Sequence, residues 1–330
     1  MGIKSLGNKY GIKYASVWSE TGTGAMKPYA PDLPLSWCGD RGVWGGGYGA
    51  SAAVRNVIDY ITITTLGNAT DFGNLSFNRY AAGSLSNGSR GCWASGVGDS
   101  DTILNNIEYI TIANTGNASN FGELLGAEGR SANAGVSNGT RGCFGGGYKD
   151  TYKNIIDYIT IANTGNATDF GDLTVARNAL GGCSSANDRG FYTGGHDASA
   201  PVNIIDYITI TNTGNATDFG DLTIDIYYCA AVASYSRALV GGGYPDNNTI
   251  GYFETSTLGN AIDFGDLTLA RQGPGACSNG VGYDADRACW GGGGGYSNVI
   301  DYVAISTTGN ATDFGDLTAA RRYTSACSGD

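Results

Sequence analysis

The chain of 330 residues contains a segment of about 49 residues that recurs six times, and this internal repeat limits the possible folds more than any other feature. The clearest copy runs through 154–161 (NIIDYITI) and 165–173 (GNATDFGDL). Near-copies begin at Asn56, Asn106, Asn203 and Asn298, and a more divergent copy begins at Asn248. The tyrosine common to all copies stands at 60, 109, 158, 207, 252 and 302, giving steps of 49, 49, 49, 45 and 50 residues. Six copies at this period predict a repeat architecture.

Each unit contains four strand signals. The first is a run of small residues such as 276–278, and the second is a glycine-rich stretch such as 141–148. The third, 156–161, has the apolar, β-branched and aromatic content of a buried strand, and the fourth begins at Phe170 and reaches Leu173 and Val175. A turn at 164–166 separates the third from the fourth. Four short strands at this period predict the blade of an all-β, six-bladed β-propeller.

Composition excludes several other classes. The 55 Gly and the low charged content of 15% disfavour a mostly helical chain. They therefore also disfavour leucine-rich and ankyrin repeats, which need helices. A content of 41% hydrophobic residues with 21 Tyr provides a core and disfavours disorder. Since no stretch approaches twenty apolar residues, we expect no membrane insertion.

Charge divides the chain into two parts. Residues 1–34 carry four Lys against Glu20 and Asp32, a net charge of +2. Since the whole chain has a net charge of −11, the remainder has a net charge of −13. Such an acidic body gains little from counterion release, which disfavours binding to nucleic acid. We therefore predict an N-terminal arm or linker at 1–34, stiffened by three prolines up to Pro34, and a propeller at 35–330.

The two ends of the repeat region complement each other. The last unit ends in a first-strand signal, 322–330, with no second strand after it, whereas the first unit opens on a second strand at Arg41. This arrangement predicts a ring closed by the C-terminal strand, which would hide the sheet edges. Residues 35–38 also resemble a first strand, so closure by the N-terminal side is the alternative.

The pattern of each unit resembles kelch repeats: a strand ending in Gly-Gly, a Tyr-bearing strand, an aromatic about a dozen residues later, and an Arg opening the next unit. Tyr158, Phe170 and Arg177 occupy these places in the third unit, with Phe where kelch repeats usually have Trp. The strings IDYITI and GNATDFGDL more specifically resemble the repeat in virion proteins of tailed phages, especially phages of marine cyanobacteria. The resemblance covers 35–330. It implies a kelch-like propeller in a fibre, spike or similar virion appendage, and it provides no catalytic residue.

Residues that recur in every blade are interpreted as scaffold. Two sets of arginines recur, one before the second strand and one before the first, and we expect them to pair with the acidic turns between blades rather than to form a carboxylate-binding cluster. These sets are Arg41, Arg90, Arg141, Arg189, Arg237 and Arg287, and Arg79, Arg130, Arg177, Arg271 and Arg321. Paired carboxylates such as Asp169 and Asp172 fit either turn chemistry or, as an alternative, calcium binding.

The only histidine and the cysteines are interpreted as structural residues rather than as catalytic or metal-binding ones. His196 is the only histidine, so it cannot build a zinc site unaided, and it takes the place of a loop tyrosine in other blades. The eight Cys contain no C-x-x-C motif and share strand positions, which favours small buried side chains in a reduced compartment. We expect no cofactor and no metal site.

A functional site is expected where the repeats differ. Residues of the scaffold recur in every blade, whereas residues of a single site do not. The loops between second and third strands vary most, and their tyrosines, amides and carboxylates suit sugar rings. The candidate ligand-binding residues are Tyr148, Lys149, Asp150, Tyr152, His196, Asp197, Tyr244 and Asp246.

The sequence therefore predicts a non-enzymatic phage virion structural protein that recognises a host-surface glycan or protein. Two alternatives remain, a purely structural decoration or joining subunit that binds other virion proteins and, less favoured, a glycan-cleaving enzyme. The expected partners are other virion proteins, bound through residues 1–34, and the host surface, in an oligomer or larger assembly. The expected location is the virion, assembled in the host cytoplasm.

Overall fold

The computed structural model describes residues 6–7, 13–14, 38–50, 53–127, 129–280 and 286–330. The chain separates into two compact units, 1–35 and 36–330. In the first unit the described residues form one short antiparallel ladder between β1 (Leu6–Gly7) and β2 (Lys13–Tyr14). The rest of the predicted arm, 1–34, lies outside the described residues.

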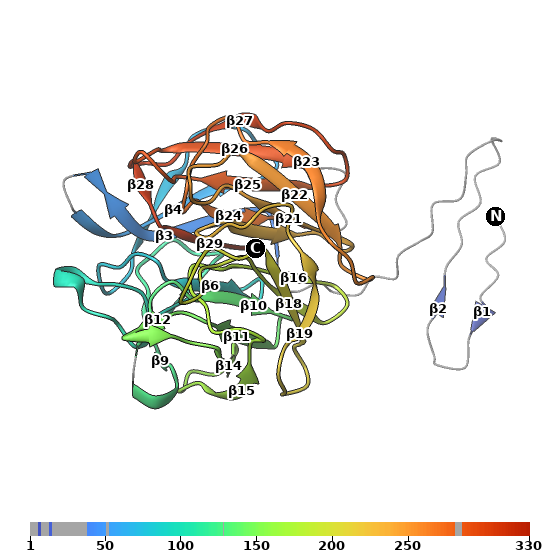
Figure 1. Cartoon of the computed structure of the whole chain (residues 1–330). Helices are drawn as coiled ribbons and strands as arrows, with labels where there is room; N and C mark the ends of the chain where they lie inside the picture. Colours follow the sequence, from blue (N-terminus) through green and yellow to red (C-terminus); the bar gives the residue numbers. More distant parts are fainter. Residues whose placement is uncertain (1–5, 8–12, 15–37, 51–52, 128, 281–285) are drawn as a thin grey trace. The chain divides into compact units, whose positions relative to one another are not determined.

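The second unit is a ring of six small antiparallel sheets, which confirms the predicted six-bladed β-propeller (Figure 1). Five of the sheets are four-stranded meanders whose first strand lies innermost and whose fourth lies outermost, and the sheet of the first blade has five strands because two short C-terminal strands occupy its inner side. Within the described residues there is no α-helix, only the short 3-10 turns η2 (Asp99–Asp101) and η3 (Leu125–Ala127), and no helix that could span a membrane.

The first three blades contain the following strands. Blade 1 has β3 (Arg41–Gly49), β4 (Ala53–Thr62) and β5 (Thr70–Asn74), with β28 (Arg321–Arg322) and β29 (Ser325–Gly329) on the inner side of β3. Blade 2 has β6 (Gly83–Ser86), β7 (Arg90–Ala94), β8 (Asn106–Thr111) and β9 (Ser119–Glu123). Blade 3 has β10 (Ala134–Ser137), β11 (Arg141–Gly145), β14 (Ile155–Thr160) and β15 (Thr168–Asp172), plus a loop hairpin of β12 (Tyr148–Lys149) and β13 (Thr151–Tyr152).

The remaining blades repeat this order without the extra hairpin. Blade 4 has β16 (Gly181–Ser185), β17 (Arg189–Thr193), β18 (Ile204–Thr209) and β19 (Thr217–Asp221). Blade 5 has β20 (Ala230–Ala233), β21 (Arg237–Gly241), β22 (Thr249–Glu254) and β23 (Ile262–Asp266). Blade 6 has β24 (Gly275–Ser278), β25 (Arg287–Gly291), β26 (Val299–Ala304) and β27 (Thr312–Asp316).

The predicted strand limits differ from the structure by one residue in the first and third strands and by more in the second and fourth. The second strand of blade 3 ends at Gly145, three residues early, because Gly146 and Gly147 adopt φ of +66° and +118° and turn the chain out of the ladder. The fourth strand begins at Thr168 and ends at Asp172, before Leu173. A bulge between Ile156 and Asp157 shifts the register of the third and fourth strands. Thr168 and Asp169 of the fourth strand then pair with the third strand, ahead of Phe170.

The C-terminal strand closes the ring, as predicted. β29 pairs with β3, with Cys327 opposite Val43, so the last residues of the chain supply the innermost strand of the first blade. The C-terminus accordingly lies at the centre of the ring in Figure 1. Residues 35–37 of the alternative closing segment lie outside the described residues.

The hydrophobic core lies between blades rather than within them. Between blades 3 and 4, for example, Ile156 and Phe170 of one blade pack with Leu180, Tyr192 and Ile208 of the next, all buried. Six clusters of this kind follow one another around the ring. Since each blade buries its faces only against its neighbours, the blades depend on one another for stability.

The shared Gly-Asn-Ala turn joins the outer edges of adjacent blades. In the third blade Gly165 N donates to Phe121 O (2.8 Å), Ala167 N donates to Glu123 O (2.8 Å), and Asn166 Oδ1 accepts from Glu123 N (3.1 Å). The backbone bonds recur at all six interfaces, and the asparagine bond does so as well. This contact explains why the asparagine of the turn recurs in every unit.

A closed ring of six backbone hydrogen bonds surrounds one end of the central channel. Each N–H donates to the carbonyl of the equivalent residue in the preceding blade, over 2.7–2.9 Å. We call these residues the mouth ring: Ala81, Ala132, Ala179, Tyr228, Gly273 and Tyr323. All six adopt φ between +52° and +61°, a conformation that costs an L-residue about 1–2 kcal/mol. The mouth ring holds the connections between blades in fixed positions around the channel.

Candidate ligand-binding face

The loops between second and third strands lie on the same face of the ring as the connections between blades, because each meander begins and ends on that side. Single backbone bridges join the two sets of segments. The bridges link Ser131 with Tyr148, Asn178 with His196, and Tyr227 with Tyr244. We call this surface the loop face. The loops that the sequence singled out are therefore fastened to the rigid part of the propeller.

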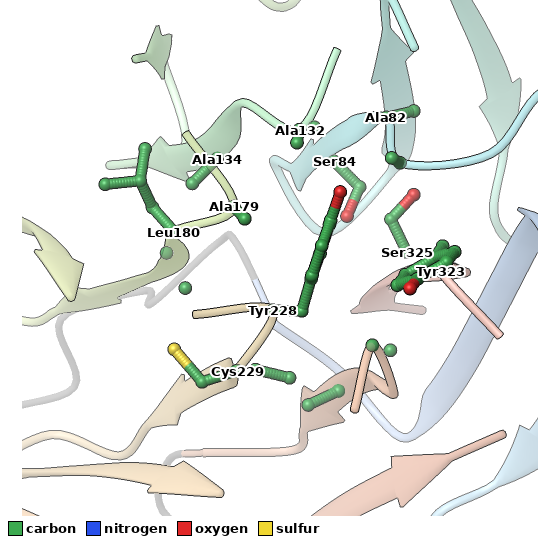
Figure 2. Close-up of a pocket in the computed structure, with 18 of the residues that line it drawn as sticks. Ala82, Ser84, Ala132, Ala134, Ala179, Leu180, Tyr228, Cys229, Tyr323 and Ser325 are labelled. Carbon is green, nitrogen blue, oxygen red and sulfur yellow. The ribbon is translucent and has the colours of Figure 1, made fainter. Parts of the chain in front are cut away.

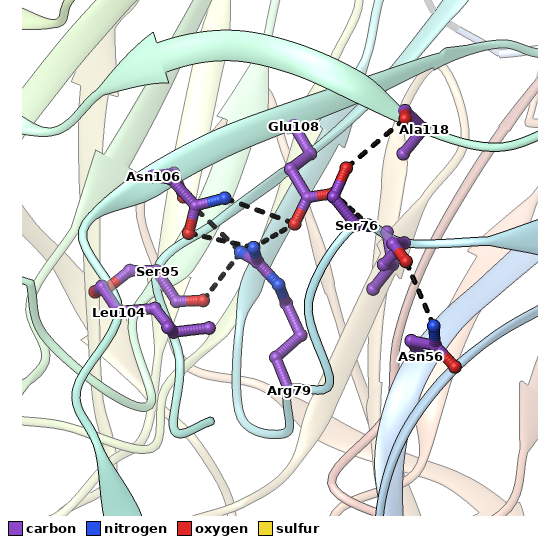
Figure 3. Close-up of polar contacts among 9 residues, drawn as sticks. Asn56, Ser76, Arg79, Ser95, Leu104, Asn106, Glu108 and Ala118 are labelled. Carbon is purple, nitrogen blue, oxygen red and sulfur yellow. Dashed lines mark hydrogen bonds and ion pairs between the residues drawn. The ribbon is translucent and has the colours of Figure 1, made fainter. Parts of the chain in front are cut away.

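Buried ion pairs join the connections between blades to the third strands beneath the loop face. Arg177 lies 2.9 Å from Asp206, and both side chains are completely buried. The equivalent pairs are Arg79–Glu108, Arg130–Asp157, Arg271–Asp301 and Arg321–Asp59. Figure 3 shows the first of these, where Arg79 also donates to Ser95 O and to Asn106. Burial alone lowers the pKa of Arg177, while Asp206 opposes that effect and keeps the cation favourable.

These pairs correct the predicted partner of the arginines. The carboxylates come from the third strand of each following blade, not from the acidic turns. The third strand places its aspartate beside the shared tyrosine, where alternation turns the carboxylate toward the connection between blades. Pairing between blades was the right expectation, and the acidic turn was the wrong partner.

Blade 5 replaces both members of the pair at once. Ile226 stands in the place of the arginine and is buried, and Gly251 stands in the place of the aspartate. An unpaired buried charge is more costly than the loss of the pair, so a joint change is the one the fold tolerates. This explains why the set of arginines that precedes the first strand contains five members and not six.

The set of arginines that precedes the second strand binds backbone carbonyls and tyrosine rings rather than acidic turns. Arg141 lies 4.2 Å from the centroid of Tyr158 and donates to Ile210 O (3.0 Å) and Thr211 O (2.9 Å) of the next blade. The same stacking occurs in every blade. These arginines bridge adjacent blades on the face opposite the loop face.

The acidic turns are fixed by backbone and asparagine hydrogen bonds, not by their carboxylates. Among the described residues, the side chains of Asp169 and Asp172 make no hydrogen bond or ion pair, whereas Asp172 N is bound by Asn215. The interpretation as turn chemistry is therefore wrong, because neither turn amides nor arginines bind these carboxylates among the described residues. In the described part of the chain no three His, Cys, Asp or Glu side chains converge as a metal site would require.

The cysteines behave as buried apolar side chains. All eight are free thiols, and all except Cys38 are buried. Burial raises the pKa of Cys92 to about 12 and that of Cys229 to about 11. Such thiols remain protonated at neutral pH and are poor nucleophiles.

The structure brings four of the predicted site residues together. Tyr148 and Tyr152 of the β12–β13 hairpin lie 5.2 Å apart between ring centroids, and His196 stacks on Tyr152 at 5.7 Å with an angle of 18° between the planes. Tyr152 Oη also lies 3.2 Å from His196 Nδ1. Tyr227 joins His196 to Tyr244, at 5.1 and 5.0 Å respectively.

The other four predicted residues lie on the same three loops as Tyr148, His196 and Tyr244. Lys149 and Asp150 form the tip of the β12–β13 hairpin, where Asp150 has a φ of +59°. Asp197 accepts hydrogen bonds from Ser199 N (2.6 Å) and Ala200 N (2.9 Å), so its carboxylate shapes its own loop. Asp246 is exposed on the blade 5 loop.

Sequence reasoning missed the larger part of the aromatic surface. Neighbouring rings lie between 4.5 and 6.3 Å apart in one unbroken series across the loop face. We call this series the aromatic band: Tyr296, Tyr48, Tyr80, Tyr323, Tyr228, Tyr227, Tyr244, His196, Tyr152 and Tyr148. Burial raises the pKa of Tyr80 and of Tyr323, so both hydroxyls remain protonated at neutral pH, and that of Tyr323 donates to Gln272 Oε1 (3.1 Å).

The aromatic band crosses the mouth of the central channel. A cavity of about 100 Å³ opens there, and Figure 2 shows Tyr228 and Tyr323 extending into it from the mouth ring. Their rings are 4.5 Å apart. Asn133 also lines the cavity, is 4% exposed, and has no hydrogen-bond partner for its amide within the described residues.

A signal for the two tyrosines was present in the repeat. When the six units are aligned, the mouth-ring position holds Ala three times, Gly once and Tyr twice. Two large aromatics where the other blades have a minimal side chain break the symmetry, which marks a candidate site. Comparing only the longest variable loops left this position unnoticed.

The fold and this face together define a six-bladed β-propeller with one specialised aromatic surface, an architecture consistent with a binding or a structural role. The chain matches no protein-family model, and a search of curated protein sequences finds no significant match. The repeat and the loop face are therefore the basis for a functional proposal.

Proposed function

We propose that this chain is a non-enzymatic binding protein of a phage virion and that its loop face recognises a glycan of the host surface. The observation that carries the proposal is the aromatic band, which spans the loop face and the channel mouth and whose mouth-ring tyrosines, Tyr228 and Tyr323, depart from the sixfold repeat. A scaffold contact would recur in every blade. The band does not.

The chemistry of the band suits sugars. Flat aromatic rings pack against the C–H faces of pyranoses, and phenolic hydroxyls, amides and carboxylates bind sugar hydroxyls. Tyr148 and Tyr244 are 38% and 43% exposed, so part of the band is open to a ligand. The bridges that fasten these loops limit the loss of conformational entropy on binding.

The virion assignment is supported by the resemblance of the repeat strings to virion proteins of tailed phages. In this proposal residues 1–34 attach the propeller to other virion proteins, within an oligomer or larger assembly. A building block that binds only virion proteins is the competing function, and a glycan-cleaving enzyme is a third.

The proposal is tested by binding of the purified protein to intact host cells and to extracted surface polysaccharide. Variants Tyr148→Ala, Tyr152→Ala and Tyr244→Ala should bind more weakly. Tyr235→Ala is the matched control, because Tyr235 is also 43% exposed but lies in a loop between first and second strands, on the opposite face.

Saturable binding that the three variants lose and the control retains would support the proposal. Absence of binding by the folded wild type would reject it in favour of a virion building block. Shortening of the polysaccharide during incubation would instead identify an enzyme.

A further inference from the structure

We propose that Arg322 and the tyrosines around it form a subsite for the carboxylate of an acidic sugar. This inference rests on the proposed glycan-binding function and names the class of glycan. It concerns the part of the loop face where the last blade meets the first.

The position of Arg322 follows from strand alternation. β28 pairs with β3 so that Arg322 lies opposite Tyr48 and Arg321 lies opposite Gly49. Successive side chains of a strand point to opposite sides. Arg321 turns inward and is buried against Asp59, so Arg322 and Tyr48 share the other side.

Three tyrosine rings surround the guanidinium. Its central carbon lies 4.9 Å from the centroid of Tyr296, 4.9 Å from that of Tyr323 and 5.7 Å from that of Tyr48. Tyr48 and Tyr296 are stacked at 6.3 Å. The rings hold the guanidinium by cation–π attraction and keep it on the loop face, next to the channel mouth.

Arg322 has no anionic partner among the described residues. No carboxylate of those residues lies within 4.0 Å of its guanidinium nitrogens, and no guanidinium N–H makes a hydrogen bond with them. Its Nε is buried without an acceptor. Arg321, one residue earlier, illustrates the opposite case, because its guanidinium is bound by Asp59 at 2.8 Å.

The charge at this position is unique in the repeat. The equivalent residues of the other blades are uncharged: Tyr80, Ser131, Asn178, Tyr227 and Gln272. The repeated arginines stabilise the contacts between blades, whereas Arg322 does not repeat and stacks on tyrosine rings without an anionic partner among the described residues. The criterion that separates scaffold from site therefore selects Arg322.

The chemistry of this group specifies its ligand. A guanidinium presents two parallel N–H donors that match the two oxygens of a carboxylate. The adjacent tyrosines offer flat faces to the pyranose ring that carries the acid. Uronic acids and related sugar acids combine these two features, and neutral sugars do not.

The experiment uses an array of carboxylated oligosaccharides, their methyl esters and neutral oligosaccharides, probed with the full chain. Wild type should bind carboxylated members about tenfold more tightly than their esters, the range of a charge-assisted hydrogen bond. Arg322→Gln should abolish that preference and retain the binding of esters. Arg322→Lys should recover only part of it, because lysine lacks the planar fork.

Arg237→Gln is the matched control, since it removes one positive charge from the opposite face, where Arg237 stacks on Tyr252. It should keep the preference for carboxylated sugars, provided that its circular dichroism shows a folded protein. Equal binding of acids and esters by the wild type, or an undiminished preference in Arg322→Gln, would overturn the inference and leave glycan binding intact. Absence of binding to every oligosaccharide and to host polysaccharide would overturn both.

Discussion

The guanidinium of Arg321 lies 2.8 Å from the carboxylate of Asp59, although 262 residues separate them in the chain. Both side chains are completely buried. The pair joins the last connection of the propeller to the third strand of the first blade. Together with the pairing of β29 and β3, this ion pair joins the two ends of the repeat region into one blade.

Removal of residues 325–330 should open the ring. The truncated chain would lose the strand that pairs with β3 and would leave the inner edge of blade 1 unpaired. We expect a large fall in melting temperature and self-association, measured by calorimetry and size-exclusion chromatography. An excess of a peptide spanning 320–330 should recover part of the stability, whereas a scrambled peptide should not; unchanged melting after truncation would contradict C-terminal closure.

The joint replacement in blade 5 predicts strong coupling within the buried pairs. Arg177→Ile should lower the free energy of unfolding by about 3–5 kcal/mol, because Asp206 would be left buried without its cation. The double variant Arg177→Ile/Asp206→Gly, which copies Ile226 and Gly251, should cost less than the sum of the single changes. A double-mutant cycle by denaturant unfolding measures the coupling, and additive costs would argue against it.

The turn contact between blades makes Gly171 sensitive to a single methyl group. A Cβ at Gly171, where φ is +147°, would lie 2.4 Å from Gly214 O of the neighbouring blade. Gly171→Ala should therefore destabilise the protein by about 1–3 kcal/mol in denaturant unfolding. Gly165→Ala is the control, because its Cβ would meet no atom within 4 Å, and it should change stability by under about 0.5 kcal/mol. Similar costs for both would show that the contact is not what requires glycine.

Asp286 should make stability depend on pH. Burial raises the pKa of this carboxyl to about 6, and its Oδ1 has no hydrogen-bond partner among the described residues. Since the unfolded carboxyl titrates near pH ~4, the folded state holds the proton more tightly, so its contribution is greatest below that pH and is lost as pH rises through about 6.

Asp286→Asn should therefore melt at a higher temperature than wild type at pH 8 and at a similar temperature at pH 4. Melting curves by circular dichroism across this range are the measurement. Asp263→Asn, at an exposed aspartate, controls for the loss of one negative charge. A lower melting temperature for Asp286→Asn at pH 8 would show that the ionised carboxylate stabilises the fold.

Local pattern was sufficient for much of the architecture. The strands around Tyr158 and Phe170 were located from β-branched and aromatic content, and closure followed from a final strand without a partner. Their limits were less predictable, because the bulge at Ile156 and Asp157 and the turn at Gly146 depend on pairing across the sheet. The loops bearing Tyr148, His196 and Tyr244 were identified because they vary between units.

The contacts that define the site could not be predicted in the same way. Tyr228 and Tyr323 are 95 positions apart in numbering, yet their rings lie 4.5 Å apart because the mouth ring directs both into one cavity. The partner of Arg177 was predicted in the wrong segment, since several carboxylates recur at the same period. Periodicity shows which residues are equivalent but not which of them meet.

The sequence by itself determined the number of blades and the order of strands, because a repeat that cannot bury its faces alone must stack against copies of itself. Only the tertiary structure decided which residues face one another across the ring. It placed Arg322 among three tyrosines and joined ten rings into one band. The physical reason is that the ring closes through contacts between blades, so each surface neighbourhood is assembled from segments that are distant in the chain.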